Sequence, residues 1–274
     1  MSILDRIVAD KKELVADAAR RMPLNQLCAR IADTAWTARG FAARLARPGP
    51  GGVNIIAEVK RASPSKGDIR PDLDAARCAA EYAAGGAAAI SVLTDGPYFK
   101  GALEDLVRAR AATDLPVLRK EFIITDYQLY EARAAGADAV LLIVRILSLS
   151  QLDGLLALTR ELGMDALVEI HSAEEYTIAR AAGSRLIGIN NRNLATFDTD
   201  LGTATTLAAR MGPGEIPVAA SGIHNRRDIE ANLAGGIFNF LIGESLVRAP
   251  DRVAFLKELM GGAPAAKQPA DGGI

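Results

Sequence analysis

The sequence predicts a (β/α)8 TIM barrel in the α/β class, preceded by an N-terminal two-helix extension. Three observations carry this prediction: a helix-to-strand junction recurs four times, a further strand pattern lies in each interval, and no GxGxxG motif follows the first strand. The composition agrees, because half of the residues are hydrophobic while only 5% are aromatic. A core of Ala, Val, Leu and Ile is typical of parallel strands covered by helices.

The recurring junction consists of an alanine-rich helix end, a glycine, and a β-branched or leucine-rich run. Its glycines are Gly85, Gly136, Gly183 and Gly235, which lie 51, 47 and 52 residues apart. Each interval is too long for one βα unit and fits two. Glycine accepts the left-handed conformation that ends a helix, after which a short loop enters a parallel strand.

One further strand is visible between consecutive junctions, and another precedes the first junction. These strands are Asn54–Val59, Pro116–Arg119, Asp165–Val168 and Ile216–Ala219, and the expected helices include 73–84, 101–112, 126–135, 149–162, 172–182 and 225–234. Eight βα units specify a closed barrel. A doubly wound open sheet is the alternative fold, but the missing GxGxxG motif and the regular repeat disfavour it.

We expect a single barrel domain over residues 1–260, which includes a helical extension over residues 1–47. Two helices, Ser2–Arg21 and Leu24–Arg47, are separated at Pro23, and residues 48–52 join them to the first strand. Residues 261–274 are rich in Gly, Ala and Pro and poor in core residues, which predicts a disordered tail. We assign no chemistry to the extension or to the tail.

The overall charge argues against a nucleic-acid partner, because 32 Lys and Arg residues stand against 33 Asp and Glu residues without a long basic run. The charged first residues lack the apolar segment of a secretory signal or a membrane span, so we expect a cytoplasmic protein. Cys28 and Cys78 belong to no CxxC motif or Cys/His cluster, which predicts neither a metal site nor a disulfide. We also expect no cofactor.

Charged and amide side chains stand at the last inward positions of four predicted strands, where barrels of this kind carry their active sites. They are Glu58 and Lys60 on the first strand, Lys120 on the third, Glu169 on the fifth and Asn190 on the sixth, with Arg192 just beyond. A solvated outward position explains any one of them equally well, but four strands that end alike favour a site. The three cations and two carboxylates leave about +1 charge, which suits an anionic substrate.

Small residues follow the seventh and eighth strands, where barrels of this fold often bind phosphate. Ser221 and Gly222 lie in the first of these turns, and Gly243 and Glu244 lie in the second. Backbone N–H groups in such turns bind phosphate, and an adjoining helix N-terminus adds a favourable dipole. Either turn alone is ordinary turn chemistry, but the pair at these two strands predicts a phosphate site.

Five segments between residues 50 and 248 resemble the indole-3-glycerol phosphate synthase family. They are Ile56-Ala-Glu-Val-Lys-Arg-Ala-Ser-Pro-Ser-Lys-Gly67, Leu118-Arg-Lys-Glu-Phe122, Leu167-Val-Glu-Ile-His171, Ile187-Gly-Ile-Asn-Asn-Arg-Asn-Leu194 and Ala220-Ser-Gly-Ile223. The first and fourth segments together are highly specific. The resemblance implies conversion of 1-(2-carboxyphenylamino)-1-deoxyribulose 5-phosphate to indole-3-glycerol phosphate, CO2 and water in tryptophan biosynthesis.

The resemblance also implies roles for individual residues. Lys120 would be the general acid at the substrate carbonyl, and Glu169 would exchange protons across the ring. Lys60 would hold the carboxylate and phosphate ends, Glu58 would orient Lys60, and Asn190 would bind the reacting hydroxyl. Phe99 and Phe122 would sandwich the anthranilate ring, Ser63, Arg192 and Leu194 would contact substrate, and Ser221, Gly222, Gly243 and Glu244 would bind phosphate.

Two positions depart from this pattern or have no role in it. The family usually places Glu immediately before Ser-Gly-Ile, whereas this chain has Ala220, so one counter-charge near the lysines is missing. Arg145 follows the fourth strand, and we expect it to form a salt bridge with a surface carboxylate.

Other functions stay open at this point. Lys120 can instead form a Schiff base in a class I aldolase, or the barrel can bind a phosphorylated metabolite or a partner subunit without catalysis. Phosphoribosylanthranilate isomerase is disfavoured, because Glu58 and Lys60 stand where its cysteine base is expected. The expected partner is a small phosphorylated substrate. We expect a monomer or weak homo-oligomer that contacts other enzymes of the tryptophan pathway.

Overall fold

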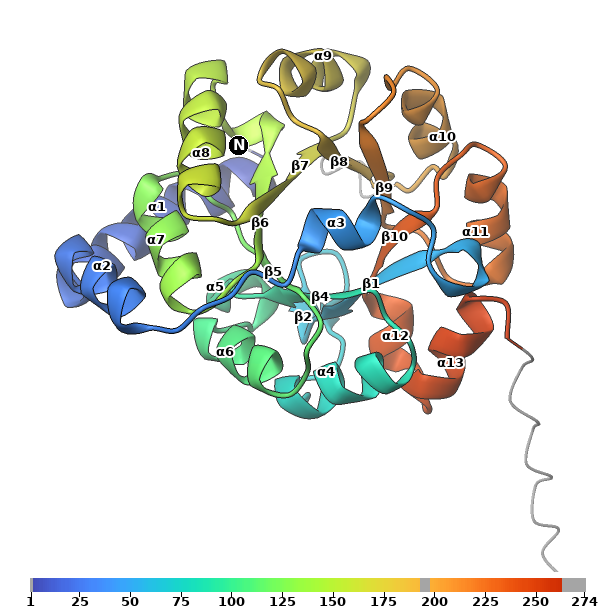
Figure 1. The fold of residues 1–274 in the computed structure, drawn as a ribbon, viewed down its shortest axis with the longest axis horizontal. Helices are drawn as coiled ribbons and strands as arrows, with labels where there is room; N and C mark the ends of the chain where they lie inside the picture. The colour runs from blue at the N-terminus through green and yellow to red at the C-terminus, as the bar shows by residue number, and fades with distance from the viewer. Residues whose placement is uncertain (1, 193–197, 263–274) are drawn as a thin grey trace, which may run out of the picture.

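The computed structural model describes residues 2–192 and 198–262, and Figure 1 shows a ring of strands surrounded by helices. Eight parallel strands close into a barrel in the order β1-β10-β9-β8-β7-β6-β5-β4. Their bounds are β1 Asn54–Val59, β4 Ala89–Leu93, β5 Val117–Lys120, β6 Ala139–Ile143, β7 Asp165–Ile170, β8 Leu186–Asn190, β9 Ile216–Ala220 and β10 Asn239–Ile242. The predicted (β/α)8 barrel is therefore confirmed. After β1, a small antiparallel hairpin pairs β2 (Ala62–Ser63) with β3 (Gly67–Asp68).

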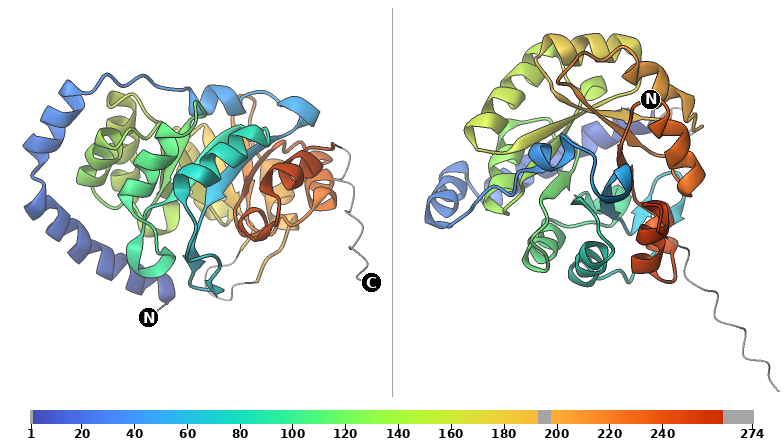
Figure 2. Two further views of the ribbon diagram at one scale, coloured as in Figure 1. Left: turned by 90° about the horizontal axis from the view of Figure 1, so that it is seen from below. Right: turned by 45° about the vertical axis from the view of Figure 1, so that its right-hand side comes forward.

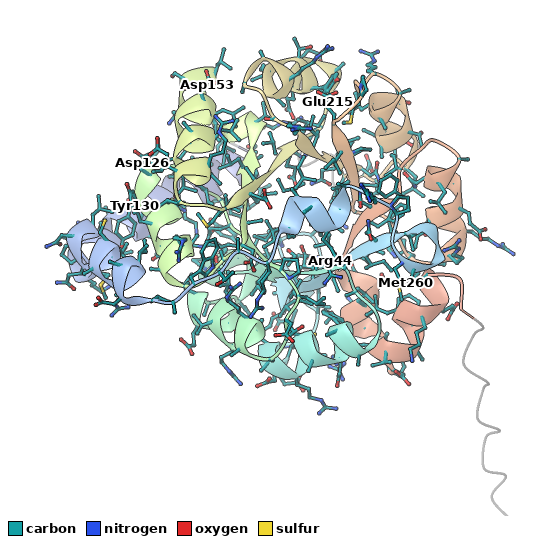
Figure 3. The ribbon with its side chains drawn as sticks, in the orientation of Figure 1. Arg44, Asp126, Tyr130, Asp153, Glu215 and Met260 are labelled. Atoms are coloured by element: carbon teal, nitrogen blue, oxygen red, sulfur yellow. The ribbon has the colours of Figure 1, made fainter. Side chains whose placement is uncertain are left out.

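Helices alternate with the strands and cover the outside of the barrel. They are α4 Ala75–Ala84, α6 Leu103–Ala111, α7 Asp126–Ala134, α8 Leu149–Glu161, α9 Ala173–Ala181, α10 Gly202–Ala208, α11 Arg226–Leu233 and α13 Arg252–Leu259. Short helical turns follow three strands: α5 Gly96–Phe99, η2 Val144–Ile146 and α12 Glu244–Arg248. Polar side chains such as Asp126 and Asp153 lie on the exposed side of this outer layer (Figure 3).

The recurring glycine junction ends four helices in the same way. Gly86, Gly136, Gly183 and Gly236 have positive φ angles. The residue after each glycine donates its N–H back to the helix, as Ala137 does to the carbonyl of Ala132 at 2.9 Å. Where two glycines adjoin, the second one turns the chain. The first, Gly85 or Gly235, is required for close packing, because a Cβ there would lie 2.8 Å from Leu256 or 2.7 Å from Thr205.

Alternating strand positions divide the core into two parts. Inward-facing side chains such as Ile56, Leu118 and Leu167 fill the barrel, while their neighbours Ile55 and Val168 pack under the helices. This alternation follows from the two-residue period of a strand. The inward-facing strand positions inferred from the sequence are confirmed. On these strands, the next inward-facing position lies at the carboxyl end of the barrel.

The N-terminal extension runs along the side of the barrel from one end to the other (Figure 2). Its first helix, α1 (Ile3–Arg21), agrees with the prediction, but the predicted helix Leu24–Arg47 is wrong in extent. The structure has α2 (Leu24–Asp33) and α3 (Phe41–Leu45), with a non-helical segment between them. Phe41 and Leu45 of α3 are fully buried against the inward-facing residues, and they close the amino end of the barrel.

The segment between α2 and α3 is non-helical because its polar groups bind the barrel instead of each other. The Arg39 backbone N–H donates to Asp138, and its guanidinium donates to the carbonyls of Thr113 at 2.7 Å and Leu115 at 2.9 Å. Trp36 donates its indole N–H to a carbonyl of the α7–β6 junction. Tertiary hydrogen bonds therefore outweigh the helical propensity of the local sequence.

No described helix is both long and apolar enough to cross a membrane.

Cys28 is exposed and Cys78 is buried, and both are free thiols. The joint before β1 includes a short 3-10 turn, η1 (Pro50–Gly52). Most of the predicted tail 261–274 lies outside the described residues, so its disorder stays a prediction.

Replacing Arg39 with Ala tests the attachment of the extension. The loss of a charged donor leaves several carbonyls without their partner, so we expect R39A to lower the free energy of unfolding by about 2–3 kcal/mol. Urea denaturation measures the change. The matched control is R44A at an exposed position of α3 (Arg44 is labelled in Figure 3), which should change the free energy of unfolding by less than about 0.5 kcal/mol. Equal losses in the two variants would contradict this account.

Candidate active site

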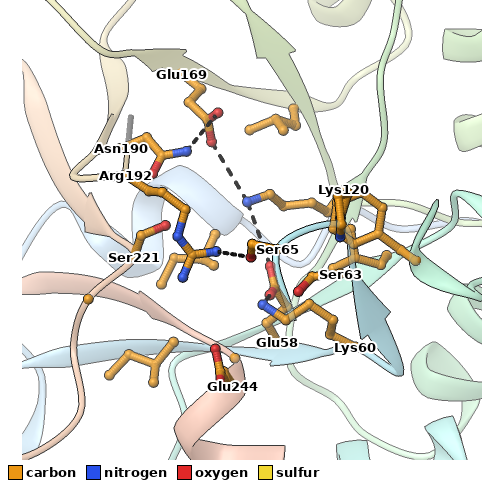
Figure 4. A pocket seen from close by; sticks show the side chains of 18 of the residues that line it. Glu58, Lys60, Ser63, Ser65, Lys120, Glu169, Asn190, Arg192, Ser221 and Glu244 are labelled. Carbon is orange, nitrogen blue, oxygen red and sulfur yellow. Dashed lines mark hydrogen bonds and ion pairs between the residues drawn. The ribbon is translucent and has the colours of Figure 1, made fainter. Parts of the chain in front are cut away.

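A pocket at the carboxyl end of the barrel collects the polar strand ends (Figure 4). Nearly all of the site residues expected from the sequence line this one pocket: Glu58, Lys60, Ser63, Phe99, Lys120, Phe122, Glu169, Asn190, Arg192, Ser221, Gly222, Gly243 and Glu244. Leu194 lies outside the described residues. The roles of these residues stay proposals, but their convergence from separate strands is a finding of the structure.

Ion pairs and a hydrogen bond link the ends of four strands across the pocket, as the dashed lines in Figure 4 show. Glu58 accepts from Lys60 at 2.8 Å and lies 3.6 Å from the Lys120 ammonium. Lys120 also lies 3.7 Å from Glu169, whose other oxygen accepts from Asn190 at 3.2 Å. Lysine and carboxylate therefore alternate from β1 through β5 to β7.

These pairs keep the central groups charged. Burial acts to raise the pKa of Glu58, but the ammonium groups of Lys60 and Lys120 hold that pKa below its ordinary value. Burial likewise acts to lower the pKa of Lys120, but Glu58 and Glu169 raise it above the ordinary lysine value. Lys120 is thus a charged N–H donor at neutral pH.

The loop after β1 contributes polar groups above the strand ends. The Ser63 hydroxyl is buried and has no hydrogen-bond partner among the described residues, which leaves it free for a ligand. Arg192 reaches across from the end of β8 to the Ser65 hydroxyl at 3.4 Å. Its backbone N–H donates to Asn190 at 3.0 Å, so Asn190 supports both Glu169 and the Arg192 turn.

The turns after β9 and β10 have the tight backbone expected of a phosphate site. Ser221 and Gly222 take consecutive left-handed conformations, with φ angles of 68° and 79°. Such a conformation is strained for serine and is often found at functional sites. The Ser245 hydroxyl donates to the carbonyl of Ile223 at 3.1 Å and ties the two turns together. A Cβ at Gly243 would collide with the carboxylate of Glu58, so the second turn requires glycine.

Phe99 and Phe122 form one apolar wall of the pocket. Their ring centroids lie 6.0 Å apart with a 41° tilt, so the rings contact each other. Sandwiching an anthranilate ring between them, as expected from the sequence, therefore requires the two rings to separate.

Helix α1 also lines the pocket, a position that the sequence did not predict for the extension. Ile3, Leu4 and Ile7 face the pocket, and the buried Lys11 ammonium pairs with Asp95 at 2.7 Å and Glu121 at 2.8 Å. Ile3, Ile7 and Lys11 recur at the four-residue spacing of one helix face. That spacing predicts a buried face but not the surface that it covers.

Arg145 forms the expected salt bridge, with its Nε atom 2.7 Å from Glu175. The partner differs from the expected surface carboxylate, because the side chain of Glu175 is only 12% exposed. The Glu175 carboxylate also accepts a hydrogen bond from the backbone N–H of His171 at 2.7 Å. Among the described residues, no group of His, Cys, Asp and Glu is arranged to hold a metal ion.

Comparison with known proteins decides the family. The sequence profile described as "Indole-3-glycerol phosphate synthase" matches residues 4–259. The chain belongs to the indole-3-glycerol phosphate synthase family. The protein of that name from Desulfosudis oleivorans is 59% identical over 94% of this chain and 98% of its own length, and that from Syntrophobacter fumaroxidans is 51% identical over 94% and 97%. Family membership makes this chain an enzyme of tryptophan biosynthesis.

Two solved structures share the fold at low sequence identity. The N-acetylmannosamine-6-phosphate 2-epimerase from Clostridium perfringens superposes with a TM-score of 0.57 at 14% identity, over 73% of this chain and 88% of that one. The thiamine phosphate pyrophosphorylase from Pyrococcus furiosus gives 0.55 at 18% identity, over 76% and 93%. They support the barrel assignment.

The paired carboxylate predicts a pH-dependent stability. Because the pKa of Glu58 is lower in the folded state, its ion pairs stabilise the fold above the unfolded value of about 4.3, and this contribution disappears as the pH falls through the folded value. We expect E58Q to cost about 3 kcal/mol at pH 7 and progressively less below pH 4.5, measured by urea denaturation at each pH.

The matched control for that series is E230Q, which breaks an exposed pair with Arg226. It should cost less than about 1 kcal/mol throughout. A cost of E58Q that does not change with pH would show that the Glu58 ion pairs do not stabilise the fold.

Proposed function

We propose that this chain converts 1-(2-carboxyphenylamino)-1-deoxyribulose 5-phosphate to indole-3-glycerol phosphate with loss of CO2 and water, as a carboxy-lyase. Family membership supports the reaction. The observation that carries the proposal is the charged Lys120 ammonium, buried between Glu58 and Glu169 in a pocket with a small-residue turn on its far side. A cytoplasmic location and a monomeric or weakly associated state stay predictions from the sequence, as do contacts with other pathway enzymes.

Lys120 is the proposed general acid of ring closure. Its ammonium donates a proton to the substrate carbonyl as the aromatic carbon attacks, and its charge stabilises the negative oxygen that develops. The two flanking carboxylates keep the ammonium charged before the step. The substrate carboxylate then leaves as CO2, which restores the aromatic ring.

The dehydration step needs a proton donor and a proton acceptor on opposite sides of the new ring. Glu169 is the proposed acid/base group, and Asn190 holds one of its oxygens while binding the reacting hydroxyl. Lys60 binds the anionic ends of the substrate and assists loss of the hydroxyl, and Glu58 orients Lys60 through the 2.8 Å ion pair. The site thus combines separate proton donors and acceptors in one pocket.

Substrate binding is assigned to the rim of the pocket. The turns at Ser221–Gly222 and Gly243–Glu244 are proposed to bind the phosphate through backbone N–H groups. Ser63 and Arg192 contact the polar part of the substrate, and Leu194 is proposed for the same region. Phe99 and Phe122 contact the anthranilate ring, with the apolar face of α1 beside them.

The ion pairs also weigh against the Schiff-base alternative. An aldolase lysine attacks a carbonyl as a neutral amine, whereas the two carboxylates around Lys120 raise its pKa. Borohydride treatment with the substrate therefore should leave Lys120 unmodified. Trapping of a covalent adduct on Lys120 would favour the aldolase.

The direct test adds the proposed substrate to the purified protein and follows indole fluorescence. We expect K120M and E169Q to lower kcat by about 10²–10⁴-fold, because each removes a proton-transfer group. K257M, an exposed position on α13, is the matched control and should leave kcat unchanged. Absence of product with the wild-type protein would reject the proposed function, and a non-catalytic binding barrel would then be favoured.

Ala220 gives a second test, because it lies in the buried interior beside Asn190 and Leu241 in the barrel register. In A220E, the added carboxylate repels Glu58 and Glu169, so we expect the acid limb of the kcat/KM profile to move to higher pH. A220Q has nearly the same shape without the charge and should leave the limb in place. An acid limb that is the same in all three proteins would refute a role for charge at this position.

A further inference from the structure

A buried histidine lies behind Glu169 and has no part in the chemistry described so far. His171 follows β7 directly, and its side chain is 3% exposed. Its Nε2 atom lies 3.7 Å from Oε1 of Glu169 and has no hydrogen-bond partner among the described residues. An unsatisfied ring nitrogen at this depth is costly, so its position beside Glu169 needs an explanation.

The other ring nitrogen is held by a carboxylate. The Nδ1 atom of His171 lies 3.2 Å from Oε2 of Glu175, which also accepts from the His171 backbone N–H. Burial acts to raise the pKa of Glu175, but the hydrogen bonds from His171 and Arg145 hold it below its ordinary value. Glu175 is therefore a charged acceptor, and Nδ1 of His171 must carry a proton to donate to it.

Fixing the proton on Nδ1 decides what Nε2 can do. In a neutral ring Nε2 would be an acceptor, and its lone pair would face the carboxylate oxygen of Glu169, which is also an acceptor. A second proton on the ring changes this contact from repulsive to attractive. The signs then alternate along one connected row, listed from the outside inward: Arg145, Glu175, His171, Glu169, Lys120, Glu58 and Lys60.

The charged groups around the ring agree with this assignment. Glu169 faces it from β7, Glu175 from α9, and Arg145 approaches through Glu175 from η2. The neighbouring strands β6 and β8 contain no charged residue. Two carboxylates therefore contact the imidazole directly, and each of them is also paired with a cation, Glu169 with Lys120 and Glu175 with Arg145.

We propose that His171 is a positioning residue, which is doubly protonated in the working enzyme and forms an ion pair through its Nε2–H with Oε1 of Glu169 across the 3.7 Å contact. Asn190 donates to the same oxygen. Both supports act on Oε1, so Oε2, which lies on the Lys120 side, is the oxygen that exchanges protons with the substrate. The kinetic consequence rests on the proposed function of Glu169, whereas the protonation of His171 does not.

Nitrogen-15 NMR of the imidazole rings tests the protonation without any substrate. The chain has two histidines, so the H224Q variant assigns the spectrum, and the exposed His224 serves as an internal reference in the wild type. Because a carboxylate lies beside each ring nitrogen, we expect both nitrogens of His171 to give the signals of N–H groups at pH 7.5. An unprotonated Nε2 of His171 at that pH would overturn the proposal.

Kinetics then separate positioning from a purely structural role. H171L removes the donor, and we expect kcat to fall by roughly 10- to 100-fold with KM within about twofold, because Glu169 loses its alignment. H171Q keeps an N–H donor that does not titrate. It should recover most of kcat.

Equal losses of kcat in H171L and H171Q would overturn the positioning role. If H171L does not fold, H171Q still decides the question: retention of most of kcat supports the positioning role, and a loss of more than about 10-fold would overturn it. Wild-type turnover is measured first. Failure there would reject the proposed function, while the NMR result would still decide the state of His171.

Discussion

The pocket depends on one buried carboxylate, Glu58, which lies between the ammonium groups of Lys60 and Lys120. Removing charges from water is costly, and a buried lysine is stable here only because a carboxylate compensates for the lost hydration. The same carboxylate restricts the turn after β10, because a side chain at Gly243 would collide with it. An ion pair thereby links the ends of β1 and β5 across the pocket. A charged proton donor can thus persist at this buried position.

Barrel geometry explains why these charges converge. Each strand points every second side chain inward, and parallel strands end at the same face, so polar residues at strand ends meet even when they are far apart in sequence. The layer beneath them is apolar, and Leu118 and Leu167 lie one inward position below Lys120 and Glu169. This arrangement separates the hydrophobic residues that stabilise the barrel from the polar residues that act on a ligand, and it lets the polar set be supported from behind by residues such as His171.

The extension links the two ends of the barrel. Helix α3 closes the amino end with Phe41 and Leu45, while α1 lines the pocket at the carboxyl end with Ile3 and Ile7. The Lys11 ion pairs attach α1 to Asp95, which caps the turn carrying Phe99, and to Glu121, which follows Lys120. The pocket wall therefore includes residues from outside the eight βα units, and a change in α1 acts on the aromatic wall as well as on stability.

Local periodicity was enough to determine the eight strands, their inward faces and the convergence of Glu58, Lys60, Lys120, Glu169 and Asn190, because a strand's two-residue period and a helix-ending glycine are short-range properties. It could not determine where the second N-terminal helix ends, since the bonds of Arg39 and Trp36 to the barrel are long-range. Nor could it show that Phe99 contacts Phe122, that Lys11 is buried, or that His171 stands between two carboxylates. The sequence by itself therefore determined which strand-end residues reach the pocket. Only the tertiary structure decided which of them are paired, because pairing depends on distances between segments that no local pattern records.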